Sequence, residues 1–205
     1  MRTLVLETAT EACSVALYEG ERLHLLDHRH ELIGRGHAER LIPMIAELPD
    51  KGKAQAIRVS LGPGSFTGLR IGLAAARALG IAWSADVKGF STLALVAART
   101  WQPAMRPVTV CMNGGHGEFF VQNFDAALQP EDAVRSLKPD AAKDAARHSV
   151  IAGNRAEPLV KLMAGDALAL DLLPEAKAFH LLNPKHLIDR LSPIYGRAPD
   201  AKLPG

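Results

Sequence analysis

Three short runs of strand-forming residues lie within the first 29 residues of the chain, and tight polar turns separate them. Runs of this length and spacing predict an antiparallel β-meander. The second half opens in a related way, because residues 108–112 and 118–124 flank the glycine-rich turn 113–117. Each half continues with α/β segments, so we expect an α/β fold of two related lobes. The three opening runs are residues 3–7, 12–18 and 23–29.

Apolar spacing and proline punctuation predict the remaining elements. Breaks at Pro103 and Pro107 separate an expected N-terminal lobe, residues 1–103, from a shortened C-terminal lobe, residues 104–205. We expect the last segment of the second lobe to pack back on the first. The expected helices are residues 37–48, a segment ending at 79, 91–99 and 180–191, and the expected strands are 55–61, 86–90 and 149–153.

The composition limits the classes of molecule that this protein is expected to bind. The 205 residues include 24 basic and 22 acidic side chains, for a net charge of +2, and only 5% are aromatic. Direct nucleic-acid binding usually needs a larger basic excess, and single-strand binding needs stacked rings. Any contact with RNA is therefore expected through a partner or on one face. The only local basic cluster comprises Arg22, Arg29, Arg35 and Arg40.

The cysteines and the hydropathy pattern indicate the cellular compartment in which we expect the protein. Cys13 and Cys111 each lie in an apolar run without a CxxC motif, so we expect two buried free thiols. No segment approaches the roughly 20 apolar residues that cross a bilayer, and the opening apolar stretch is too short for a signal peptide. We therefore expect a cytoplasmic protein without a membrane partner.

The segment GPGSFTG, residues 62–68, joins an expected strand to an expected helix. Its glycines allow positive φ angles and close approach to another group, and the helix N-terminus attracts anions. It is not a Walker A loop, because no Gly-Lys-Ser/Thr is present. These residues alone favour a tight structural turn with Ser65 or Thr67 as the helix cap. The motif residues are Gly62, Gly64, Ser65, Thr67 and Gly68.

Small residues recur at every fourth position along the helix that follows, at Gly68, Gly72, Ala76 and Gly80. They share one helix face, which a second helix or a sheet can approach closely. Glycine inside a helix costs about 0.5–1 kcal/mol relative to alanine, so close packing should offset it. The stripe is equally compatible with packing on the protein's own sheet and with an interface to another subunit.

The turn after the first strand carries Glu7, Thr8 and Thr10. Hydroxyls and amides of such a turn can hold a phosphate, and the carboxylate can hold a hydrated magnesium ion. Ordinary turn chemistry accounts for the same residues. In the phosphate-binding alternative, the glycine-rich turn 113–117 faces them across a cleft.

No self-contained catalytic site emerges. Neither cysteine has an adjacent histidine, and Ser65 does not lie in a GxSxG nucleophile elbow. His28, His30 and His37 lie close in sequence, but HELIG lacks the second histidine of an HExxH zinc motif. We expect no catalytic residue and no metal site in this chain.

Several segments together resemble the TsaB (YeaZ) family, a glycoprotease-like family of tRNA threonylcarbamoyladenosine biosynthesis. They are LVLETATEACSVAL, HAERLIPMI, GPGSFTGLRIGLAAARALG, GFSTL and SPIYGRAPDAK. The resemblance is strongest over residues 1–93 and 193–202. It implies the two-lobed, ribonuclease H-like fold of actin, Hsp70 and the sugar kinases, with a mixed sheet and a β-meander in each lobe.

The resemblance also implies a function. A member of this family is a non-catalytic subunit that pairs with the catalytic subunit TsaD and works with the ATPase TsaE. Together they attach a threonylcarbamoyl group to the adenosine beside the tRNA anticodon. The chain then needs no cofactor of its own, with ATP or ADP and Mg²⁺ at the interface of the complex. First-lobe helices mediate this pairing and homodimerisation, so the interface candidates are Leu41, Ile45, Gly68, Gly72 and Ala76.

The chain departs from the family pattern in two hairpins. Glu7 stands where an aspartate is usual, and Asn113, Gly114 and Gly115 stand where the family has Asp-Ala-Arg. A longer acid displaces a metal-bound water, and the second change removes a charged pair. Both changes weaken the alternative function, a stand-alone ATPase or phosphotransferase that holds nucleotide at Glu7, Thr8 and Thr10.

Overall fold

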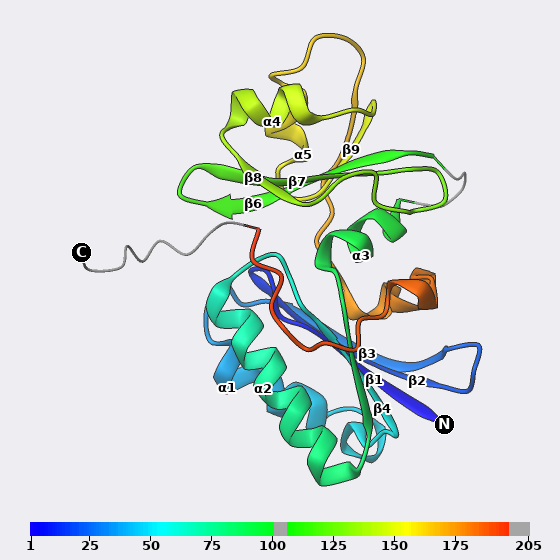
Figure 1. The fold of residues 1–205 in the computed structure, drawn as a ribbon. Helices are drawn as coiled ribbons and strands as arrows, with labels where there is room; N and C mark the ends of the chain where they lie inside the picture. The colour runs from blue at the N-terminus through cyan, green and yellow to red at the C-terminus, as the bar shows by residue number, and fades with distance from the viewer. Residues whose placement is uncertain (101–105, 197–205) are drawn as a thin grey trace.

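The computed structural model describes residues 1–100 and 106–196, and it consists of two stacked lobes (Figure 1). The strands of the first lobe are β1 (Arg2–Glu7), β2 (Ala12–Glu19), β3 (His24–Leu32), β4 (Ala56–Ser60) and β5 (Asp86–Phe90). β1, β2 and β3 pair antiparallel as a meander, whereas β4 pairs parallel with β1 and β5 with β4. The strand order is therefore β3-β2-β1-β4-β5.

The second lobe repeats this arrangement. Its strands are β6 (Val108–Gly115), β7 (Glu118–Phe124), β8 (Arg135–Leu137), β9 (Val150–Ala152) and β10 (Leu168–Leu170). β6, β7 and β8 pair antiparallel, and β9 and β10 add parallel on the other side of β6. The order β8-β7-β6-β9-β10 matches the first sheet strand for strand. The expected α/β fold with a mixed sheet and a β-meander in each lobe is confirmed.

Helices cover the outer faces of the two sheets and fill the space between them (Figure 1). The helices are α1 (His37–Ala46), α2 (Phe66–Trp83), α3 (Thr92–Arg99), α4 (Pro139–Ala145) and α5 (Ala156–Val160). α1 and α2 pack on each other and on the first sheet, and α4 and α5 pack on the second. α3 contacts β6 and lies between the lobes.

Serine residues begin two of these helices. The Ser65 hydroxyl oxygen accepts a 3.2 Å hydrogen bond from the Gly68 amide, and the Ser91 oxygen accepts one of 3.4 Å from the Ala94 amide. Each bond satisfies a backbone donor that the first helical turn leaves free. Ser65, rather than Thr67, is therefore the cap of α2.

One hydrophobic cluster contains residues of both lobes and joins them. Val5 of the first sheet and Val110 of the second belong to one buried cluster, and the Tyr18 hydroxyl donates a 2.9 Å hydrogen bond to the Ala176 carbonyl. A second cluster lies under α1 and α2 and includes Leu4. Because both faces of β1 are buried, its sequence is a continuous apolar run rather than an alternating one.

The predicted helix over residues 180–191 is wrong. The chain instead forms two 3₁₀ turns, η2 (Ala176–Leu181) and η3 (Pro184–His186), and is extended at Leu187. Proline lacks an amide donor and disfavours helical geometry in the preceding residue, so Pro184 prevents a continuous α-helix.

The chain then returns to the first lobe. Gly89 at the β5 edge exchanges backbone hydrogen bonds of 2.8 and 2.9 Å with Ile188, and the Ile194 amide donates one of 2.7 Å to Leu61. The C-terminal segment thus crosses the first lobe after the second lobe is complete. The predicted lobe boundary between residues 103 and 104 lies outside the described residues.

Some short elements escaped prediction, namely β8, β10, α5 and the 3₁₀ turn η1 (Pro49–Gly52). Cys13 and Cys111 are buried and unpaired, as predicted. In the described part of the chain, no helix is long and apolar enough to cross a membrane.

Candidate functional site

The motif 62–68 docks the start of α2 against the turn that follows β1. The Ser65 amide donates a 2.7 Å hydrogen bond to the Ala9 carbonyl, and the Thr8 hydroxyl donates one of 2.8 Å to the Gly68 carbonyl. A Cβ atom on Gly64 or Gly68 would collide with the carbonyl oxygen of Ala9 or Thr8. The two glycines therefore permit a backbone approach that no larger residue allows.

The other motif residues support this junction. Gly62 is buried with a φ of 94° and links β4 to the loop, whereas the Thr67 side chain is exposed. The structure thus agrees with the turn interpretation of the motif. Its amides at Ser65 and Gly68 are already engaged within the chain.

The Glu7 carboxyl group lies in the interior, beneath that turn. It is fully buried and accepts a 2.7 Å hydrogen bond from the Ala9 amide, and the Thr92 hydroxyl donates a longer one of 3.5 Å. The Ser60 and Thr92 hydroxyls lie 2.5 Å apart beside it. Burial raises the pKa of Glu7 to about 7, because desolvation disfavours the charged form.

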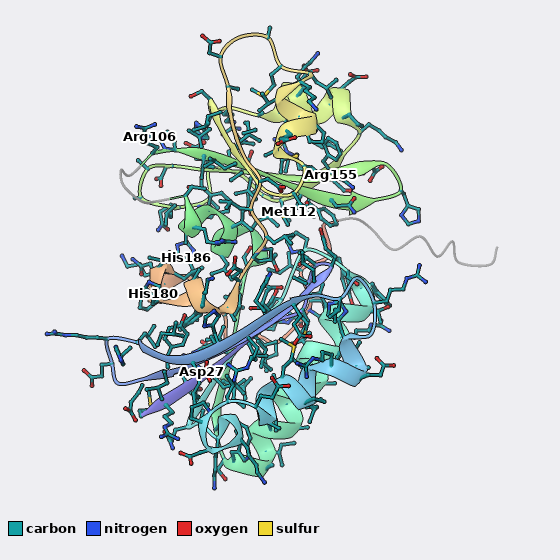
Figure 2. The ribbon with its side chains drawn as sticks, turned by 180° about the vertical axis from the view of Figure 1, so that it is seen from behind. Asp27, Arg106, Met112, Arg155, His180 and His186 are labelled. Carbon is teal, nitrogen blue, oxygen red and sulfur yellow. The ribbon has the colours of Figure 1, made fainter. Side chains whose placement is uncertain are left out.

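A cleft of about 830 Å³ lies between the lobes, within the volume range of small-molecule sites. Thr10 lines it, but Glu7 and Thr8 do not. From the second lobe come residues 113–116, so that hairpin does face the turn after β1 across the cleft. Figure 2 shows Met112, another lining residue, at the level where the lobes meet.

Asn154 bridges the two sides of the cleft. Its side-chain amide donates a 3.0 Å hydrogen bond to the Glu11 carboxylate, and its side-chain oxygen accepts one of 2.9 Å from the Asn113 amide. Sequence analysis missed this residue. The repeat of the lobes could have identified it. β9 occupies the position in the second sheet that β4 occupies in the first, and Asn154 follows β9 as the motif 62–68 follows β4.

An aromatic wall lines the first-lobe side of the cleft. Phe66 at the start of α2 and Tyr195 of the C-terminal segment have ring centroids 6.0 Å apart. The guanidinium carbon of Arg70, one turn further along α2, lies 3.7 Å from the Phe66 ring centroid. None of these three residues emerged as a candidate from sequence. Phe66 and Arg70 lie beside Tyr195 only because the C-terminal segment returns to the first lobe.

The predicted interface residues require a correction. Leu41, Ile45, Gly68, Gly72 and Ala76 are all buried by the chain itself, so they do not form an exposed partner surface. The small-residue stripe faces the first sheet. A Cβ atom on Gly72 would collide with the Thr8 hydroxyl, and one on Gly80 would lie 2.5 Å from Val87. Close packing on the protein's own sheet is therefore the reason for the stripe.

The opposite faces of the same helices are open. Ile42 of α1 is 50% exposed and Ile81 of α2 is 85% exposed. Pro43, Ala74 and Ala78 are exposed as well. Alanines four residues apart and an isoleucine three residues further share one face of α2, so α1 and α2 together present an apolar surface to solvent.

Two arginines of the basic cluster are engaged in ion pairs, whereas Arg22 and Arg35 are exposed. Arg29 pairs with Asp27 and Glu47, and Arg40 pairs with Glu31 and Glu47. The His37 Nε2 atom lies 3.2 Å from the Ala12 carbonyl, to which it donates. Among residues 1–100 and 106–196, no group of three or more His, Cys, Asp or Glu side chains is arranged to hold a metal.

Magnesium-bound nucleotide, the ligand that the fold suggests, fits the cleft poorly. The carboxyl group of the first turn, Glu7, is buried and does not line the cleft, and the carboxylate that lines it is Glu11. In the second-lobe hairpin, the Asn113 and Gly115 amides already donate to side-chain oxygens. We therefore derive no step through a bound triphosphate.

Two lobes with the same meander-led sheet and a cleft between them define the class of actin-like ATPase and sugar-kinase folds. The family model described as "TsaD: tRNA N6-adenosine threonylcarbamoyltransferase" matches residues 30–166. The chain belongs to this family, and within it the chain is similar to the TsaB (YeaZ) proteins.

Individual relatives support this assignment. YeaZ from Pseudomonas aeruginosa superposes with a TM-score of 0.78 at 26% identity, covering 95% of this chain and 99% of that one. "tRNA threonylcarbamoyladenosine biosynthesis protein TsaB" of Escherichia coli is 38% identical over 107 residues, 50% of this chain and 45% of the relative. The protein of that name from Haemophilus influenzae is 46% identical over 90 residues, 41% and 36% of the two chains. The chain spans about half the length of the curated relatives it matches.

Proposed function

We propose that this chain is a non-catalytic subunit that pairs with a TsaD-type transferase and supports transfer of a threonylcarbamoyl group to tRNA adenosine, beside the anticodon. The names of its relatives supply the pathway. The observation that carries the proposal is the apolar surface on α1 and α2, which residues 1–100 and 106–196 leave uncovered. Exposed apolar side chains gathered on two neighbouring helices are typical of a protein interaction site.

Four described groups with catalytic potential are buried or engaged, which supports a subunit without chemistry of its own. Burial raises the pKa values of Cys13 and Cys111 to about 12, so neither is a thiolate at neutral pH. The Ser65 hydroxyl caps α2, and the Glu7 carboxyl group is enclosed.

The proposal has further parts that rest on the family. A TsaE-type ATPase is the second protein partner, a homodimer forms in isolation, and tRNA is bound through the assembled complex. Because tRNA is the substrate, the chain acts in the cytoplasm. ATP or ADP with Mg²⁺ acts at the interface with a partner, since the fit to this chain's own cleft is poor.

The decisive experiment mixes the full chain with the TsaD-type protein of the same organism at micromolar concentration. Sedimentation velocity should show a heterocomplex. Ala78→Glu puts a charge on the apolar surface and should weaken the complex at least tenfold. The matched control is Leu168→Glu, which alters a 50% exposed leucine on the second lobe and should leave pairing unchanged. Absence of a complex, or equal binding by both variants, would reject the proposal.

A further inference from the structure

The C-terminal segment, residues 187–196, runs along the first lobe and forms neither a helix nor a strand there. Hydrogen bonds at Ile188, Leu191 and Ile194 attach it to β5, to α2 and to the residue that follows β4. The bond to α2 is donated by the Arg77 guanidinium group, over 2.6 Å, to the Leu191 carbonyl. A segment that is attached at so few points opens more readily than the sheet beneath it.

The end of this segment lies between the two lobes. A Cβ atom on Gly62 would lie 3.2 Å from the Ile194 carbonyl oxygen, so the segment passes directly over the motif loop of the first lobe. A Cβ atom on Gly196 would lie 2.5 Å from two ring carbons of Phe120, in β7, and 3.3 Å from Pro63. Gly196, Phe120 and Pro63 all line the cleft. The backbone at Gly196 therefore connects the lobes at the cleft.

A separate connection between the lobes is the crossing of the chain from β10 to η2, and it is held more firmly. The Ala176 carbonyl accepts the hydrogen bond of the buried Tyr18 hydroxyl, and the Ala176 amide donates one of 3.0 Å to the Ser14 hydroxyl oxygen. Arg99, at the end of α3, forms a 2.7 Å ion pair with Glu175. Figure 1 shows η2, in orange, well apart from the red end of the described chain, which reaches the second lobe. The crossing can therefore act as a hinge while the segment end moves.

We propose that residues 187–196 are a latch that sets the separation of the lobes. While Gly196 lies against Phe120 the latch is closed, and when this contact breaks, the lobes open about the crossing between β10 and η2. The hydrogen bond from Asn154 to Glu11 is a second tie across the cleft. The open state is a minor population of the free protein. The latch belongs to the single chain and does not depend on pairing with a transferase.

The test measures the separation of the lobes in the full chain by pulsed electron paramagnetic resonance. Spin labels are attached through Thr67→Cys on α2 and Glu157→Cys on α5, two exposed positions, one on each lobe. Cys13 and Cys111 are buried and should stay unlabelled. Labelled protein is diluted with an excess of unlabelled protein, so that distances between two copies do not contribute. With the latch intact, one distance should dominate.

Variants in this labelled background assign the effect to the latch. Gly196→Val puts a side chain where the Phe120 ring lies, so it should add a population at longer distance. Ser192→Val is the matched control, because it adds a valine at an exposed position of the same segment that does not line the cleft. Asn154→Ala combined with Gly196→Val should enlarge the long-distance population beyond the sum of the two singles, because the two ties act together.

Circular dichroism first shows whether each variant is folded. Gly196→Ala adds the colliding Cβ atom alone, and it decides the test if the valine variant does not fold. The proposal is overturned if the folded Gly196 variants give the distance distribution of the parent, or if Ser192→Val changes that distribution as much as Gly196→Val does. These measurements use no partner protein, so failure of the latch and failure of the proposed subunit role are distinguishable.

Discussion

The Thr8 hydroxyl donates a 2.8 Å hydrogen bond to the carbonyl oxygen of Gly68, which ties the turn after β1 to the first turn of α2. The same hydroxyl lies where a Cβ atom on Gly72 would be. The Thr8 side chain thus requires a small residue at position 72, and it also hydrogen-bonds the backbone of Gly68, one helical turn earlier in α2. This junction accounts for Gly68 and Gly72 of the small-residue stripe, whereas Gly80 packs on Val87.

Gly72→Ala should destabilise the protein, although alanine is the better helix former. The added methyl group collides with the Thr8 hydroxyl, and overpacking of this kind costs about 1–3 kcal/mol. Urea unfolding of the parent, Gly72→Ala, Thr8→Ala and the double variant measures the effect. Thr8→Ala makes room for the methyl group, so the double variant should lose less than the sum of the two singles. A Gly72→Ala protein more stable than the parent would contradict the assignment.

Glu7 should make stability fall as pH rises. Its folded pKa of about 7 lies above the ordinary 4.5, so folding favours the protonated carboxyl group. This contribution is fully present below pH 4.5 and is lost as pH rises to 7, by up to about 3 kcal/mol. Glu7→Gln stays neutral and can donate to Thr92 while accepting from Ala9. Denaturant unfolding should show parent and variant alike near pH 4.5 and the variant more stable at pH 8.

Ser65→Ala should destabilise α2 by about 0.5–2 kcal/mol, the range for loss of an N-cap side chain. Thr67→Ala is the matched control, because its exposed hydroxyl belongs to the same motif without capping the helix. Thermal unfolding followed by circular dichroism compares the two. If both substitutions lower the melting temperature equally, the hydrogen bond of the N-cap does not explain why serine stands at position 65.

Asn154→Ala should loosen the cleft without unfolding the lobes. It removes the hydrogen bonds to Glu11 and to the Asn113 amide, for a stability loss of about 1 kcal/mol. Hydrogen exchange should accelerate in the hairpin 113–117 and in the turn after β1. Protection in α3 and β6 should be unchanged, since the shared core holds them. Uniform acceleration across the chain would indicate global destabilisation instead.

Local patterns predicted much of the first lobe. The runs at residues 3–7, 12–18 and 86–90 coincide with β1, β2 and β5 to within a residue, because apolar runs between turn residues carry that information. The three-residue strands β8 and β10 have no such pattern, and their pairing is set by neighbouring strands.

The candidate site was harder to predict, for two physical reasons. Spacing identifies a helix face but not its neighbour, so the stripe of Gly68 and Gly72 was compatible with either its own sheet or a partner. The cleft also draws Phe66, Asn154 and Tyr195 from three distant parts of the chain. Tyr195 reaches the cleft through the return of the C-terminal segment, in which residues 180–191 were predicted to be helical.

That path has a consequence for biosynthesis. Ile188 covers the edge of β5 and Ile194 pairs with Leu61, yet a ribosome makes both residues only after every strand of the second lobe. When the first lobe leaves the ribosome, the edge of β5 is therefore unpaired and Leu61 lacks its contact with Ile194. Both contacts form only after the rest of the polypeptide has been made. We expect the two halves to reach their final form together rather than one after the other.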